Sequence, residues 1–150
     1  MLYQPSEQST TELYQASLNE FALLKISGED SFTFLQSQLS QDMRLVSAKQ
    51  AQLATFSTAK GRVLANFLIW QDAEPETPTY YACIQQDIAE ATQKRLSMFV
   101  LRAKVKVELL DSTICGIWGT NLDTVAQRLD IDCSQSSPTI NADTFAVIKK

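Results

Sequence analysis

The sequence contains no histidine, and its 150 residues include only three cysteines, four glycines and four prolines. The lack of histidine excludes, within these residues, Ser-His-Asp and Cys-His catalysis, histidine-ligated zinc and proton transfer by an imidazole. Any acid–base chemistry carried by this stretch must therefore use Asp, Glu, Lys, Tyr or Cys side chains.

The three cysteines, Cys83, Cys115 and Cys133, are widely spaced and form no C-x-x-C pair. Such a scattered set is typical of a reducing compartment rather than of a disulfide framework, so we expect each thiol to be a small buried hydrophobe. The first residues lack the basic and apolar regions of a signal peptide, and no apolar run approaches the roughly 20 residues of a membrane span. These features predict a cytoplasmic protein with no membrane association.

Acidic residues outnumber basic ones, 17 to 13, which gives a net charge of −4. Domains that grip a phosphate backbone usually carry a basic excess, so direct nucleic-acid binding is not expected. A chain of this length buries about 70% of its unfolded surface and can form a true core. The length suits one domain, or one domain and a fragment of another.

The order of apolar runs and turn signals indicates strands in pairs and threes separated by helices, which predicts an α+β fold with mostly antiparallel sheets. Strands are expected at residues 13–18, 21–26, 53–57, 62–70, 80–85, 105–110, 113–119 and 144–148, and helices at 29–42, 87–99 and 122–129. Residues 1–11 are polar and predicted to be disordered. The pattern reads as a repeated unit whose second copy is incomplete, so we expect residues 12–150 to be the N-terminal part of a longer domain.

The first helix is predicted from a turn at Gly28 followed by acidic residues. Glu29 and Asp30 would lie in its first turn, where negative charge complements the helix dipole. Phe32, Leu35 and Leu39 would form its buried face.

For the second helix, Asp87 and Glu90 suggest a capping box, with a buried face of Ile88, Ala91, Leu96 and Phe99. The strand at 62–70 is apolar at nearly every position, which predicts a central strand covered on both faces.

Four ordered stretches resemble the YgfZ/GcvT family, which groups bacterial tRNA-modifying YgfZ proteins with the T-protein of the glycine cleavage system. They are residues 21–30, 34–42, 59–63 with Asn66 further along the strand, and 105–119. The resemblance is closer to YgfZ than to the T-protein. It implies a folate-binding fold of two strand–helix subdomains that exchange their first strands. The family's later Lys-Gly-Cys-Tyr-x-Gly-Gln-Glu segment is not found in these residues.

The resemblance also implies tetrahydrofolate as the ligand, with Phe21 at the position of a folate-contacting tryptophan. A phenylalanine there keeps the ability to stack on a flat ring, although it would serve equally as a core aromatic. Lys60 and Arg62 flank Gly61 at a hairpin tip, where they would hold the carboxylates of a folate tail, contact a phosphate or act as a solubilising turn.

Three further polar positions are candidates for the same site. Asn66 is expected to be a buried amide that hydrogen-bonds either a pterin edge or neighbouring backbone. Gln36, Gln38 and Asp42 cluster near one helix end, and Gln38 and Asp42 are spaced to share a face that lines a pocket or meets water.

The leading hypothesis is a folate-binding YgfZ-like protein that supports iron–sulfur cluster maintenance and tRNA modification, with iron–sulfur enzymes as indirect partners. In this form it would bind rather than catalyse. One alternative is an aminomethyltransferase like the T-protein, which needs a carboxylate near the folate nitrogen. Another is a structural module whose unpaired strand edges pair with a second copy as a homodimer.

Overall fold

The computed structural model describes residues 13–48, 50–72, 75–119, 139–140 and 143–144. Its elements follow the order β1 (Leu13–Ser17), β2 (Phe21–Ser27), α1 (Ser31–Gln38), the 3-10 helix η1 (Met43–Leu45), β3 (Gln52–Ser57), β4 (Val63–Gln71), β5 (Thr79–Gln85), α2 (Gln86–Val100), β6 (Lys106–Leu110), β7 (Cys115–Gly119), β8 (Thr139–Ile140) and β9 (Asp143–Thr144). No helix among these residues has the length and apolar character needed to span a membrane.

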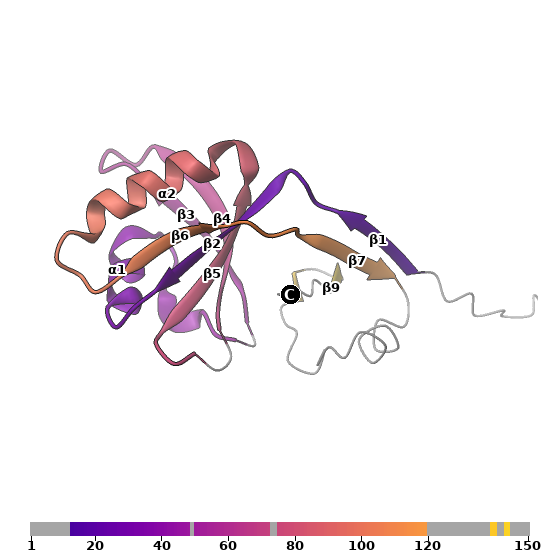
Figure 1. Ribbon diagram of the computed structural model, residues 1–150, viewed down its shortest axis with the longest axis horizontal. Helices are drawn as coiled ribbons and strands as arrows, with labels where there is room; N and C mark the ends of the chain where they lie inside the picture. The colour runs from indigo at the N-terminus through magenta and orange to yellow at the C-terminus, as the bar shows by residue number, and fades with distance from the viewer. Residues whose placement is uncertain (1–12, 49, 73–74, 120–138, 141–142, 145–150) are drawn as a thin grey trace, which may run out of the picture.

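A five-stranded antiparallel sheet in the order β3-β4-β5-β2-β6 forms the body of the molecule (Figure 1). Its central strands β5 and β2 pair over seven residues, from Phe21 opposite Gln85 to Ser27 opposite Thr79. The predicted hairpin of β3 and β4 turns at Gly61, whose φ of 80° favours glycine. These features confirm the α+β class with antiparallel sheets.

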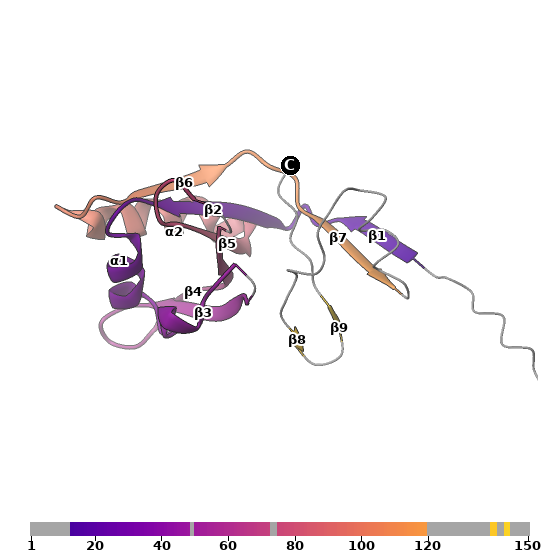
Figure 2. The ribbon, with the colours of Figure 1, turned by 90° about the horizontal axis from the view of Figure 1, so that it is seen from below.

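β1 does not join this sheet, although it precedes β2 by only a short turn. It pairs instead with β7, from Leu13 opposite Gly119 to Ser17 opposite Cys115, while β6 takes the place beside β2. Figures 1 and 2 show the resulting β1–β7 ribbon projecting from one end of the five-stranded sheet. The first strand of the second unit therefore completes the first sheet, and the first strand of the first unit pairs in the second, which is the exchange that the resemblance implies.

Both long helices pack on one face of the five-stranded sheet. Leu24 and Ile26 of β2 project from that face into a single cluster with Phe34 and Leu35 of α1 and Leu96 of α2. Leu24, Ile26, Leu35 and Leu96 are at most 1% exposed. Burial of each such side chain contributes about 1.5–3 kcal/mol, so this face supplies the main core.

The buried face of α1 includes Leu35 as predicted but not Phe32. Ser31, Phe34 and Leu35 are buried, whereas Phe32 is 38% exposed. The Ser31 hydroxyl donates a hydrogen bond to the Pro78 carbonyl at 3.0 Å, which turns this residue inward and brings Phe34 and Leu35 to the same side. Leu39 is buried as predicted, although it lies just beyond the helix.

The predicted helix starts are also corrected. α1 begins at Ser31, so Glu29 and Asp30 precede its first turn; there Asp30 accepts a hydrogen bond from the Lys104 amide and Glu29 pairs with the Lys104 ammonium. These acidic side chains tie the β2–α1 turn to the chain that leads into β6.

α2 begins at Gln86, so Asp87 lies within its first turn and forms no capping box. Glu90 pairs with Lys94 instead. The buried positions are Ala89, Thr92 and Leu96, with Ile88 partly buried, whereas Ala91 and Phe99 are exposed.

β4 is covered on one face only, contrary to the prediction. Ala65, Phe67 and Ile69 are at most 3% exposed and face the helices. The opposite face carries Leu64 and Leu68, both half-buried, and Asn66, which is exposed. The strand is apolar on both sides because its second face lines a cavity rather than a second layer of core.

Several expected elements lie outside the described residues. They are the disordered stretch at 1–11, the helix at 122–129 and most of the strand at 144–148. Cys133 also lies there. Residues 139–140, where no strand was expected, form β8.

Candidate functional site

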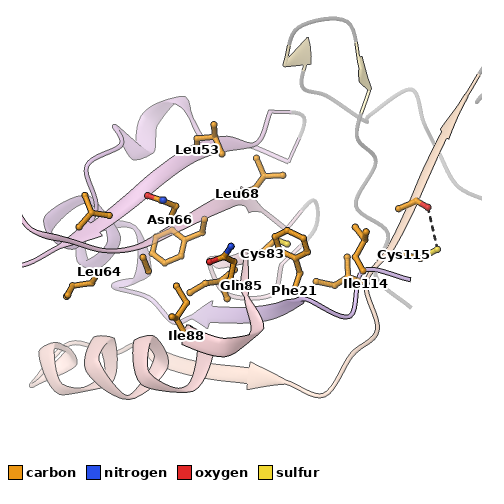
Figure 3. Close-up of a pocket in the computed structure, with 16 residues that line it drawn as sticks. Phe21, Leu53, Leu64, Asn66, Leu68, Cys83, Gln85, Ile88, Ile114 and Cys115 are labelled. Atoms are coloured by element: carbon orange, nitrogen blue, oxygen red, sulfur yellow. Dashed lines mark hydrogen bonds between the residues drawn. The ribbon is translucent and has the colours of Figure 1, made fainter. Parts of the chain in front are cut away.

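A cavity of about 820 Å³ lies on the open face of the five-stranded sheet. Apolar side chains make up most of its wall, among them Leu53 of β3, Leu64 and Leu68 of β4 and Ile114 before β7. Figure 3 shows these side chains around one hollow, together with Phe21, Asn66 and Gln85. The cavity sits where the sheet meets the start of the β1–β7 ribbon, so the strand exchange helps to form it.

Phe21 and Asn66, two of the predicted site residues, both line this cavity. Phe21 is the first residue of β2 and is 37% exposed, so its ring is open to the hollow rather than packed in the core. Asn66 lies in the middle of β4, opposite Thr55 of β3. The sheet therefore brings together an aromatic face and an amide that are far apart in the sequence.

Asn66 differs from its predicted state, because its side chain is exposed rather than buried. No other residue in the described part of the chain makes a hydrogen bond to its side-chain amide. The amide has two donors and an acceptor available at the cavity wall.

Gln85 is a second amide at this site, and the sequence analysis missed it. It is the last residue of β5, directly opposite Phe21 in the antiparallel pair, and it lines the same cavity. Its position at the junction of a strand and a helix gave no signal of a site. Its pairing with Phe21 was the only indication of a site, and the register of β2 against β5 cannot be predicted from a single sequence.

Two thiols also border the cavity, contrary to the expectation that the cysteines are fully buried. Cys83 is half-buried and Cys115 is exposed. Burial raises the pKa of the Cys83 thiol, which keeps it neutral at physiological pH. The Cys115 thiol lies 3.7 Å from the Gly116 carbonyl oxygen, to which it donates a weak hydrogen bond.

Gln36 and Asp42 stabilise a turn and do not line the cavity. The Gln36 side-chain oxygen accepts a hydrogen bond from the Met43 amide at 2.8 Å. Asp42 caps η1 by accepting from the Arg44 amide, and it forms an ion pair of 2.7 Å with the Arg44 side chain. Hydrogen bonds from Arg44 hold the pKa of the Asp42 carboxyl below its ordinary value.

Gln38 and Asp42 do not share a helix face, because α1 ends at Gln38. Gln38 instead lines a second cavity on another side of the molecule. Lys60 and Arg62 are exposed at the β3–β4 hairpin tip and are not part of the wall that holds Phe21 and Asn66. The seven candidates therefore fall at four places rather than one.

Comparison with known proteins finds relatives in sequence and a solved structure with a similar fold. No protein-family model matches the chain. A glycine cleavage system aminomethyltransferase T from Bartonella henselae superposes with a TM-score of 0.70 at 14% sequence identity, over 81% of this chain and 33% of that one. The tRNA-modifying protein YgfZ from Vibrio vulnificus is 24% identical over 125 residues, which cover 83% of this chain and 37% of that protein. The chain is YgfZ/GcvT-like. An iron–sulfur cluster assembly factor IBA57 homolog, mitochondrial, from Aspergillus fumigatus is 27% identical over 139 residues, covering 82% of this chain and 31% of the relative.

The YgfZ/GcvT-like chain thus spans about a third of the length of these relatives, between 31% and 37%.

Proposed function

We propose that this chain forms part of a reduced-folate site in a YgfZ-like protein, with the pterin ring held in the cavity beside Phe21. The observation that carries the proposal is the convergence of Phe21, Asn66 and Gln85 on one hollow of about 820 Å³. Ligand pockets are commonly about 300–1,000 Å³, mostly apolar, with a few polar groups that fix orientation.

The chemistry of the wall suits a flat, neutral heterocycle. An exposed aromatic face such as Phe21 stacks on a ring and contributes about 1 kcal/mol beyond burial. Asn66 and Gln85 each offer an amide donor and acceptor, which complement the amide-like edge of a pterin. None of the described residues that line the cavity carries a formal charge, so the carboxylates of a folate tail belong outside it.

The proposed wider role is support of iron–sulfur cluster maintenance and tRNA modification in the cytoplasm, with iron–sulfur enzymes as indirect partners. Its support is the naming of the relatives, one as a tRNA-modifying protein and one as an iron–sulfur cluster assembly factor. Binding of a folate against the apolar wall of this cavity is compatible with a non-catalytic role of the chain in such a process.

Isothermal titration of 5-formyltetrahydrofolate, a stable reduced folate, into the purified chain tests the site directly. We expect saturable binding that Asn66→Ala weakens about tenfold, because loss of hydrogen bonds of this kind costs about 1–1.5 kcal/mol. Phe21→Leu should also weaken binding, since it removes the stacking face but keeps an apolar side chain.

Gln50→Ala is the matched control, because Gln50 is an exposed amide in the loop before β3 and outside the cavity. It should leave the affinity unchanged. A titration with no saturable heat, or an equal loss from Asn66→Ala and Gln50→Ala, would contradict the proposal.

A further inference from the structure

A second cavity, of about 620 Å³, lies where the end of α1, the end of β3 and the last turns of α2 meet. It shares no lining residue with the folate cavity. Its wall is mixed in character: Arg95 and Phe99 come from α2, Gln38 from the end of α1, and Thr58 from the hairpin after β3.

Arg95 and Phe99 are four residues apart on α2 and therefore lie on the same helix face. The Phe99 ring is 47% exposed, yet its position is fixed by an edge-on contact with the buried Phe56 ring, with centroids 6.3 Å apart. A fixed, open aromatic ring beside a guanidinium is suited to a ligand that has both a flat ring and an anionic group.

Arg95 has no acidic partner within the described chain. The ion pairs found there use Arg44, Lys94, Lys104 and Lys106. Two more cations without an ion pair in the described residues, Lys60 and Arg62, lie just beyond the lining residue Ala59 at the hairpin tip. Arg95 thus lies in the cavity wall, and two further cations stand on the hairpin that borders it, where the Arg62 amide donates a hydrogen bond to the hydroxyl of the lining residue Thr58 at 3.1 Å.

The helix C-termini at this cavity repel an anion, whereas the basic side chains attract one. The sizes of these two electrostatic effects decide which prevails. α1 and α2 both end here, and a helix C-terminus is equivalent to about half a negative charge. Two such ends amount to about one negative charge, against the positive charge of Arg95 in the wall and those of Lys60 and Arg62 on the bordering hairpin. The local field therefore favours an anion.

We propose that this second cavity binds a small phosphorylated compound that carries a planar ring, with the phosphate at Arg95 and the ring against Phe99. Gln38, whose side-chain amide is half-buried and donates to the Ser37 hydroxyl at 3.2 Å, stands at the wall as a further polar contact. The hairpin cations Lys60 and Arg62, expected from the sequence to hold a folate tail, take the role of attracting the phosphate to this cavity.

Titration of AMP into the ¹⁵N-labelled full chain, followed by amide chemical shifts, tests the site, with adenosine and inorganic phosphate as separate probes. We expect AMP to saturate with a Kd below about 1 mM and to shift the amides of residues 37–40 and 57–59. Adenosine and phosphate, which each supply half of the recognition, should bind more weakly than AMP.

Arg95→Gln should weaken AMP binding about tenfold or more, because it removes a charge-assisted hydrogen bond. Lys94→Gln is the matched control: it is the neighbouring cation on the same helix, but it pairs with Glu90 and does not line the cavity. Both side chains are exposed, so neither change should disturb folding.

Equal effects of the two variants, shifts confined to other residues, or no saturation by AMP would overturn the proposal. Equal binding of phosphate and AMP would overturn the part assigned to Phe99. The folate titration of Arg95→Gln should match that of the unaltered chain, because the two cavities share no residue. Failure of one site is therefore distinguishable from failure of the other.

Discussion

Cys83 and Cys115 line the same cavity in different surroundings, and this difference predicts their reactivity. The thiolate is the reactive form, and burial raises the pKa of Cys83, so less of it is thiolate at any given pH. Cys115 is exposed. We expect iodoacetamide to alkylate Cys115 faster than Cys83 at pH 8, because Cys115 is exposed, and we expect the pH midpoint of the Cys83 rate to lie higher in the folded than in the urea-unfolded chain.

Peptide mass spectrometry over a series of pH values measures both rates in one sample and separates them from Cys133. Urea-unfolded chain is the control, because the two thiols should then react at similar rates. The same Cys83 midpoint in the folded and the unfolded chain would show that burial does not govern Cys83.

Single residues were predictable where their chemistry alone marks them. Phe21 and Asn66 stood out as an aromatic and an amide within apolar strands, and both line the cavity. Gln36 and Asp42 do not line this cavity, because Gln36 accepts a hydrogen bond from the Met43 amide and Asp42 caps η1. A polar side chain near a helix end serves a turn as readily as a ligand, and only the backbone geometry tells which.

The turn from β2 into α1 depends on Gly28, whose φ is 134°. A Cβ at this position would lie 1.9 Å from the Lys104 carbonyl oxygen. This is a backbone atom, so it can move away only at a large cost in free energy. We expect Gly28→Ala to lower the free energy of unfolding by about 3 kcal/mol or more, since it adds a steric clash to an unfavourable φ. Urea denaturation measures the change.

Gly61→Ala is the matched control for that measurement. Gly61 also has a positive φ, of 80°, but an added Cβ would meet nothing within 4 Å. Its cost should be about 1 kcal/mol, from the backbone conformation alone. Equal losses for the two variants would mean that the contact with the chain before β6 contributes nothing.

Most of the described strands and α2 were predicted to within two residues of their bounds, whereas α1 was not, and the reason is physical. Apolar runs and the Gly61 turn define β3 and β4 to within a residue or so of their observed bounds. The start of α1 was misplaced because Glu29 and Asp30 bind Lys104 rather than the helix terminus. A tertiary contact of 74 residues' separation overrode the local capping signal.

The molecule as a whole is divided by the strand exchange into a five-stranded sheet with a helical core and a two-stranded ribbon. The α+β class followed from the order of strands and helices, but the pairing of β1 with β7 entered only through the family resemblance. A strand's pattern shows which face is apolar, and it does not show which of two edges it will join.

This division predicts unequal stability along the chain. β2 and β5 have a partner on each side and a face in the core, whereas β1 and β7 pair with each other alone among the described strands. A lone pair of strands is only marginally stable. We expect the amides of β2 and β5 to exchange with deuterium about 100-fold more slowly than those of β1 and β7.

Hydrogen exchange followed by NMR resolves these amides within one sample. Leu24→Ala, which removes a fully buried side chain of the main core, should speed exchange in β2 and β5 by destabilising that unit, and it should leave the ribbon little changed. Equal protection of ribbon and sheet, with both responding to Leu24→Ala, would show instead that they unfold together. In that case the sheet and the ribbon would separate only on global unfolding. A ligand would then have to enter the cavity at their junction through its existing mouth in the native state.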